Sequence, residues 1–265
     1  MPVLNDITLG HYYPVDSFVH KLDPRTKLIA TFTGMTGLLF AHQFYGLIII
    51  SIVILISIRA SQIPGKLIFG NLRPFLWLFL LTFIIHMLFS QGTPIYTIPY
   101  INLTIGEEGI SNGIVFSMRL VLIITIAAIL TLATSPIEIT DALEVMFSPL
   151  KRFGVPTHDL TMMMTLSLRF IPTLMMEADK LRKAQISRGV QFEGKIIQRL
   201  RNMIPLILPL FLSVFRRADE LALAMDARCY NGGEGRTRFK QLRFHLNDYY
   251  VLAGTLIIFI FMIVS

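Results

Sequence analysis

Residues 114–133 read IVFSMRLVLIITIAAILTLA, a run whose one charged side chain belongs to Arg119. A hydrocarbon core about 30 Å thick requires roughly 20 helical residues, so the run predicts a transmembrane helix. The composition agrees, because 54% of the 265 residues are hydrophobic and the mean hydropathy is +0.63. A soluble domain is rarely this apolar.

Four other apolar stretches approach spanning length. They are residues 28–41, 44–58, 72–89 and 246–264, and the first two, separated by His42 and Gln43, are short for a span. We therefore predict an all-α integral membrane protein with about five transmembrane helices. Its expected parts are a membrane domain with four spans (1–135), cytoplasmic coupling helices (136–243) and a C-terminal transmembrane helix (244–265).

Positive charge predicts the orientation of these spans. Lys and Arg gather before the first span, between the second and third, and above all after the fourth, where seventeen lie in 151–243. The segment 90–113 has none and carries Glu107 and Glu108. Because basic loops stay in the cytoplasm, the N-terminus is expected to be cytoplasmic and 90–113 external. The net charge of +7 then reflects membrane topology, and no nucleic-acid partner is expected.

The basic region 136–243 contains long helical patterns. Residues 138–150 predict a short amphipathic helix, and 159–188 and 195–228 predict two long ones, the second bent at Pro205 and Pro209. Its apolar run at 204–215 is too short to span a bilayer. Both long helices are expected to begin against the membrane and end in the cytosol.

One phrase occurs in both of these predicted helices. Residues 178–188 read ADKLRKAQISR and residues 218–228 read ADELALAMDAR, which share the pattern A-D-x-L-x-x-A-x-x-x-R. On a helix, the shared Leu, Ala and Arg fall on one face. These residues are Leu181, Ala184 and Arg188 in the first copy and Leu221, Ala224 and Arg228 in the second. Each copy predicts an apolar docking stripe that ends in an arginine, so the chain is expected to bind two similar partners.

The sequence contains no motif for catalysis. It has no Gly-rich loop followed by Lys-Ser or Lys-Thr, no His-Glu-x-x-His and no serine elbow, so we expect no enzyme activity and no cofactor. Cys229 is the single cysteine, and no metal site is expected.

Several short motifs together identify a family resemblance. They are LDPRTKL at 22–28, TSP at 134–136, ALE at 142–144, SPLKR at 148–152, LRFIP at 168–172 and two triplets at 187–189 and 227–229. Through them, nearly the whole chain resembles the transmembrane T component of energy-coupling factor (ECF) transporters, which are ATP-driven vitamin importers of prokaryotic plasma membranes.

The resemblance implies a non-catalytic scaffold with two kinds of partner. Each triplet arginine would end a coupling helix that docks in a groove of one of two ATPase subunits. The same helices would support a substrate-binding membrane subunit, the S component. The implied docking residues are Ser187, Arg188, Gly189, Ala227, Arg228 and Cys229. In the family these triplets are of the Ala-Arg-Gly type, and this chain departs from that pattern at Ser187 and Cys229. Both residues are small, so the expected docking role of the arginines is unaffected. The helix cap after Arg228 could differ from the cap after Arg188.

Alternatives remain open at this stage. Arg188 followed by Gly is also ordinary helix-ending chemistry. Asp179 and Asp219 are expected to be local ion partners on their helices, and Arg119 is expected to reach the external membrane interface. The first copy is basic and the second nearly neutral, which favours two different ATPases. The function could instead be that of a nickel or cobalt importer T component, or of a self-contained membrane carrier or enzyme.

Overall fold

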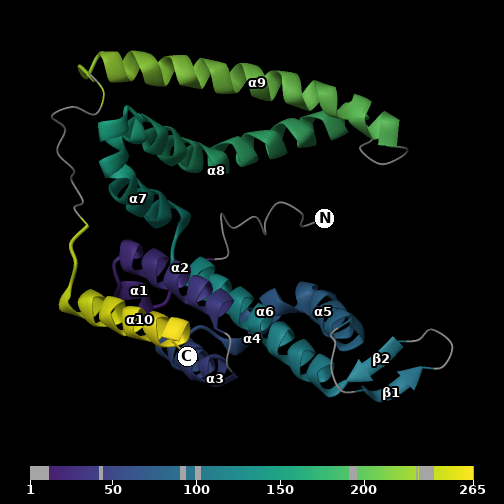
Figure 1. Cartoon of the computed structure of the whole chain (residues 1–265). Helices are drawn as coiled ribbons and strands as arrows, with labels where there is room; N and C mark the ends of the chain where they lie inside the picture. Colours follow the sequence, from purple (N-terminus) through teal and green to yellow (C-terminus); the bar gives the residue numbers. More distant parts are fainter. Residues whose placement is uncertain are drawn as a thin grey trace. The chain divides into compact units, whose positions relative to one another are not determined.

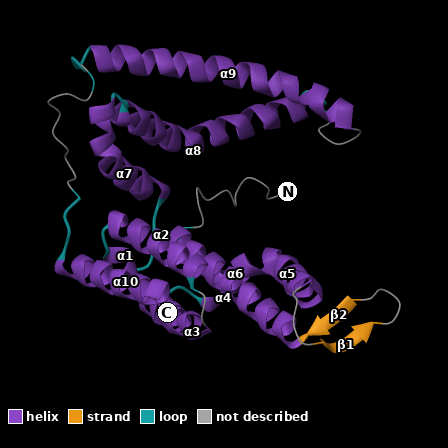
Figure 2. Cartoon of the chain, in the orientation of Figure 1, coloured by secondary structure: helices purple, strands orange, loops and turns teal. Residues whose placement is uncertain are grey.

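The computed structural model describes residues 12–41, 44–89, 94–98, 103–190, 196–230, 232 and 242–264. Within these residues the structure is helical apart from one short antiparallel hairpin (Figure 2). The chain divides at 139/140 and 241/242 into two compact units. We call the unit formed by the described residues up to 139 and from 242 the membrane unit, and the other the α8–α9 unit.

The membrane unit holds most of the helices (Figure 1). They are α1 (Phe18–Lys21), α2 (Pro24–Phe40), α3 (Phe44–Ser61), α4 (Gly65–Leu72), the 3-10 turn η1 (Arg73–Phe75), α5 (Leu76–Phe89), α6 (Glu107–Ala133) and α10 (Leu246–Val264). In the described part of the chain, four segments are long and apolar enough to cross a bilayer: Phe44–Ser61, Gly65–Phe89, Glu107–Ala133 and Leu246–Val264. The prediction of an all-α membrane protein is confirmed. Because α2 has 17 residues, the lower limit for a span, a fifth crossing stays a prediction.

Two spans extend beyond their predicted limits. The third begins at Gly65 instead of residue 72, because η1 contains Pro74 in its first turn, where the missing N–H is tolerated. The fourth begins at Glu107 instead of residue 114, since Glu107 and Glu108 complement the positive end of the helix dipole. The predicted external segment also contains strands β1 (Pro94–Ile98) and β2 (Leu103–Gly106). Sequence analysis missed this hairpin.

Small residues bring α5 and α6 into close contact. A Cβ atom on Gly109 would lie 2.9 Å from the carbonyl oxygen of Met87, and one on Gly113 would lie 3.1 Å from that of Phe83. One helical turn further, the Ser117 hydroxyl donates to an α5 carbonyl at 3.2 Å. Glycines four residues apart allow two transmembrane backbones to approach closely. Gly109, Gly113 and Ser117 form a stripe of small residues, the glycine stripe, along which α5 and α6 pack antiparallel.

Both ends of α2 are joined to α6 through a basic side chain. The Lys27 ammonium of α2 donates to the carbonyl of Ala133, the last residue of α6, at 3.0 Å. The Arg119 guanidinium of α6 donates to the carbonyl of Ala41, the C-cap of α2, at 2.6 Å, and lies over the Phe116 ring. Arg119 thereby satisfies a free helix-end carbonyl within the unit, and its expected position at the external interface stays a prediction.

The start of α2 has a structural role. Asp23 caps the helix by accepting from the Arg25 N–H at 2.9 Å. The fully buried Asp248 carboxylate accepts from the Asp23 N–H at 2.9 Å and from the His245 N–H at 2.7 Å. The Arg25 guanidinium donates to the Leu242 carbonyl at 3.0 Å. These contacts connect the beginnings of α2 and α10.

The α8–α9 unit begins within α7 (Pro136–Phe147), which contains the 139/140 boundary. The 3-10 helix η2 (Ser148–Phe153), α8 (Thr157–Ser187) and α9 (Ile196–Asp226) follow. The two long helices agree with prediction to within two residues. Residue 195, where the second long helix is predicted to begin, lies outside the described residues. Pro172, Pro205 and Pro209 lie inside the long helices, and α8 bends near its middle in Figure 1, as an internal proline favours.

Candidate docking site

The first copy of the repeated phrase ends in a helix-terminating turn built around Gly189. The Gly189 N–H donates to the Ile186 carbonyl at 2.9 Å, and the Val190 N–H donates to the Gln185 carbonyl at 3.0 Å. Gly189 is left-handed, with φ of +88°. This pair of bonds around a left-handed residue is the Schellman motif, and it places Arg188 at the C-cap of α8.

The second copy ends in the same turn, although Cys replaces Gly. The Cys229 N–H donates to the Asp226 carbonyl at 2.9 Å, and the Tyr230 N–H donates to the Met225 carbonyl at 3.1 Å. Cys229 has φ of +55°, a conformation that costs a non-glycine residue about 1 kcal/mol or more. The cap after Arg228 therefore keeps the geometry of the first copy, and the possibility of a different cap is not realised.

Both docking triplets are exposed. Ser187, Arg188, Gly189, Ala227, Arg228 and Cys229 all have exposed side chains or backbone. Ala184 and Ala224 are exposed, and Leu181 and Leu221 are partly buried. Within the described residues the structure shows no ion pair to either docking arginine. The two guanidinium groups are accessible to a partner.

The two arginines lie at opposite ends of an antiparallel helix pair (Figure 1). Midway, Glu177 of α8 accepts from the Ser213 hydroxyl of α9 and lies 3.5 Å from the Arg217 guanidinium. At one end, the Tyr230 hydroxyl contacts the Met162 sulfur in the second turn of α8 at 2.9 Å. Arg188 closes α8 26 residues after Met162, which corresponds to about 40 Å of helix. One small partner surface cannot cover both ends.

Glu177 is a residue that sequence analysis did not single out. It is the acceptor of the central α8–α9 contacts, with Arg217 also over the Phe170 ring at 5.9 Å. An acidic residue opposite a serine 36 positions away and an arginine 40 positions away gives no local pattern, so the sequence carried no signal for it.

The two copies differ in charge. Asp179 forms an i,i+4 ion pair with Lys183 at 2.6 Å, which confirms its expected local role. Lys180 and Lys183 are exposed in the first copy, whereas Glu220 is exposed in the second. The surface leading to Arg188 is therefore more basic than the surface leading to Arg228.

Helix α9 exposes many large apolar side chains, far more than a solvated helix of a monomer usually does. Exposed apolar residues on it are Ile197, Leu200, Met203, Ile204, Ile207, Leu208, Phe211, Leu212, Val214, Phe215 and Leu223. Met163, Met164 and Met176 add an exposed apolar set on α8. Flexible methionine side chains adapt to different partner surfaces. These faces favour contact with lipid or with an apolar protein.

Among the described residues, no group of three or more His, Cys, Asp or Glu side chains is placed to hold a metal ion. The described contacts around both arginines either terminate a helix or pair α8 with α9. The geometry supports binding to other proteins.

Comparison with known proteins gives consistent matches over most of the chain. The sequence model of a family described as "Cobalt transport protein" (CbiQ) matches residues 16–239. An energy-coupling factor transporter transmembrane protein EcfT from Ruminiclostridium cellulolyticum is 45% identical over 96% of this chain and 95% of its own length. Proteins of the same name from Acidaminococcus fermentans (44%; 99% and 97%) and Bacillus subtilis (40%; 97% and 97%) are similarly close. The chain belongs to the family of energy-coupling factor transporter transmembrane proteins.

Proposed function

We propose that this chain is the scaffold of an ATP-driven importer, and that Arg188 and Arg228 each dock one ATPase subunit. ATP hydrolysis then takes place on these partners. The observation that carries the proposal is the identical Schellman turn at both ends of the α8–α9 pair, each presenting one exposed arginine. A capping role alone does not require arginine before Cys229, because the backbone bonds already complete the turn.

Arginine suits such a contact for physical reasons. Its planar guanidinium donates several hydrogen bonds in a fixed geometry and keeps its charge at any working pH. Because the arginine at the helix end is positively charged, it does not repel acidic groups in the partner groove. The roughly 40 Å of helix between the ends favours two ATPase subunits per chain, in agreement with the presence of two copies.

The charge difference between the copies favours two different ATPases. A groove that meets Lys180 and Lys183 should be acidic, whereas a groove that meets Glu220 should not. We therefore propose that the ATPase pair is a heterodimer. Cross-linkers placed beside Arg188 and Arg228 should capture different ATPase chains; capture of one identical chain by both would contradict the heterodimer and leave the scaffold intact.

The exposed apolar faces of α8 and α9 support a second part of the proposal. They fit an apolar, substrate-binding membrane subunit, the S component. Opening and closing of the ATPase pair would change the position of the two helix ends relative to each other, and the subunit resting on these faces would tilt. The substrate is then selected by that subunit. The match to a cobalt transport family favours a cobalt or nickel importer as the second candidate, and uptake of labelled cobalt compared with vitamins by the purified complex separates the two.

The charge distribution and the apolar spans support a proposal for the location of the chain. We propose that the chain lies in the prokaryotic plasma membrane with its N-terminus and residues 136–243 in the cytoplasm, where the ATPases have access to both arginines.

Removal of each arginine tests the docking role. Arg188→Ala or Arg228→Ala should leave the chain inserted and folded but weaken ATPase co-purification, because loss of a desolvated charge contact commonly costs about 2–5 kcal/mol. Arg216→Ala is the matched control, since it removes an exposed positive charge away from the helix ends. Normal assembly and uptake in both arginine variants would remove the docking role.

A further inference from the structure

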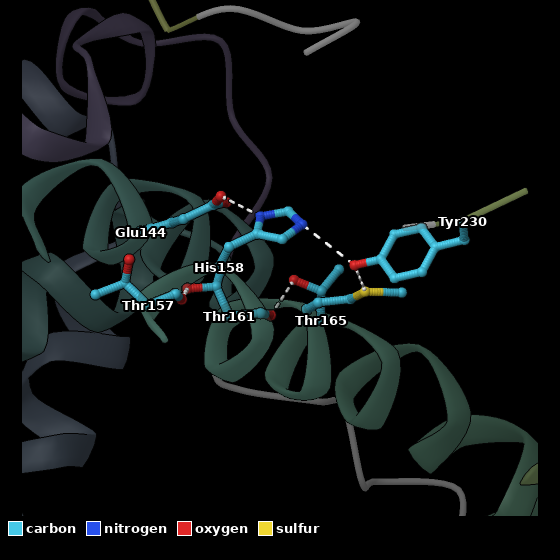
Figure 3. A network of polar contacts seen from close by, with 7 residues as sticks. Glu144, Thr157, His158, Thr161, Thr165 and Tyr230 are labelled. Carbon is cyan, nitrogen blue, oxygen red and sulfur yellow. Dashed lines mark hydrogen bonds and ion pairs between the residues drawn. The ribbon is translucent and has the colours of Figure 1, made fainter. Parts of the chain in front are cut away.

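A network of polar contacts joins the second docking end to two other helices (Figure 3). The His158 imidazole, in the first turn of α8, lies 3.0 Å through Nδ1 from the Glu144 carboxylate of α7. Its Nε2 lies 3.4 Å from the Tyr230 hydroxyl, which donates to the Met162 sulfur at 2.9 Å. One ring can serve both neighbours because its nitrogens lie on opposite sides.

Tyr230 has a special place in the repeat. It directly follows Cys229, and its backbone N–H closes the Schellman turn that presents Arg228. The equivalent residue after Gly189 is Val190, which closes the first turn through its N–H but has no polar side chain. The Arg228 end is therefore held by side-chain hydrogen bonds of a kind that the equivalent Val190 cannot make.

Helix α7 connects this network along the chain to a membrane span. Helix α7 begins at Pro136, three residues after α6 ends at Ala133. At this junction the Ser135 N–H donates to the Glu138 carboxylate and the Glu138 N–H donates to the Ser135 hydroxyl, both at 3.3 Å. This reciprocal capping box fixes the start of α7. A displacement of α7 would therefore act close to the end of α6.

We propose that Tyr230 is a positioning residue for the second docking end: through His158 and Glu144 it fixes the Arg228 turn to α8 and α7, so that an ATPase bound there moves α7. This rests on the docking function proposed above. The two ends then have different roles. Arg228 is fixed directly to α7 and to the start of α8, whereas Arg188 lies at the far end of α8, beyond the internal Pro172. Contiguous hydrogen-bonded elements of this kind carry coupling between sites.

Tyr230→Phe tests the proposal, because it removes the hydroxyl and keeps the ring. Spin labels at Phe147 of α7 and Leu223 of α9, both exposed, report the distance between these helices in the isolated full chain, with Cys229→Ser removing the native thiol while an L-residue stays in the left-handed position. The variant should broaden the measured distance distribution. Tyr250→Phe, which changes an exposed tyrosine of α10, is the matched control and should not.

Function provides the second readout. In the assembled complex, Tyr230→Phe should keep both ATPases bound and lower substrate uptake per ATP hydrolysed by roughly fivefold, the effect of losing one net hydrogen bond. Glu144→Ala should act similarly, and the double variant should be no worse than either single one, because neighbours in one network are not additive.

Two results would overturn the proposal: an unchanged distance distribution in Tyr230→Phe, or fully additive effects of the two substitutions. The distances are measured without partners, so they stand apart from the docking function. Arg228→Ala with normal ATPase attachment would remove docking while leaving the distance result in place.

Discussion

Gly189 and Cys229 occupy the same position in two copies of one helix-ending turn, and both are left-handed, with φ of +88° and +55°. The pairing shows that the turn is kept even where its residue is unfavourable. A left-handed cysteine is uncommon, because its Cβ approaches the following carbonyl oxygen. The contacts of Tyr230 with His158 and Met162 lie immediately beyond it and stabilise the turn.

This difference predicts unequal responses to alanine. Gly189→Ala should lower the free energy of unfolding by about 1 kcal/mol, because it places a Cβ in a left-handed conformation. Cys229→Ala should be nearly neutral, since one left-handed L-residue replaces another. Thermal unfolding of the purified chain compares the two. Equal losses, or a larger loss at Cys229, would contradict this account of the caps.

Close α5–α6 packing predicts a strong effect at Gly109. A Cβ there would lie 2.9 Å from the Met87 carbonyl oxygen, so Gly109→Ala should force the helices apart at a cost of about 1–3 kcal/mol. Gly254→Ala is the matched control, because a Cβ on Gly254 meets no atom within 4 Å. Unfolding in mild detergent measures both. Similar stability of the two variants would argue against the glycine stripe.

Buried Asp248 predicts a graded series. Asp248→Ala orphans the N–H groups of Asp23 and His245, at about 1–3 kcal/mol for each buried donor. Asp248→Asn retains one acceptor oxygen and should lose less. Asp159→Ala, at an exposed residue of α8, should change stability little. If Asp248→Ala and Asp159→Ala have the same free energy of unfolding, the Asp248 carboxylate does not hold the starts of α2 and α10 together.

The orientation predicts which cysteines react from each side. In a Cys229→Ser background, a cysteine at Thr97 should react with an impermeant thiol reagent added outside intact cells. A cysteine at Lys151 should react only after the cells are opened. The reverse pattern would overturn the topology inferred from the Lys and Arg distribution.

The sequence was a good guide where the cause is local. Apolar runs predicted the spans of α3 and α10, and helical periodicity predicted α8 and α9 nearly to the residue. The close α5–α6 contact could also have been predicted, because Gly109 and Gly113 have the four-residue spacing of transmembrane helix pairs. The role of Arg119 could not, since it depends on where the end of α2 packs against α6.

The cap geometry after Arg228 also could not be predicted from local sequence patterns. Glycine is the usual signal for a left-handed helix end, and Cys229 lacks it. The turn forms because backbone hydrogen bonds and the Tyr230 contacts outweigh the strain. Similarly, the antiparallel pairing of α8 and α9 depends on Glu177 and on residues forty positions away. Such contacts are visible only once the fold is known.

The central claim, that each arginine end docks one ATPase, is tested most directly by site-specific photo-cross-linking. Ala184 and Ala224 are equivalent exposed positions in the two copies. A chain with a photoreactive residue at both should give an adduct containing two ATPase subunits, and Arg188→Ala or Arg228→Ala should remove the cross-link at its own end only. A chain that captures at most one ATPase subunit, or captures two regardless of both arginines, would contradict the claim.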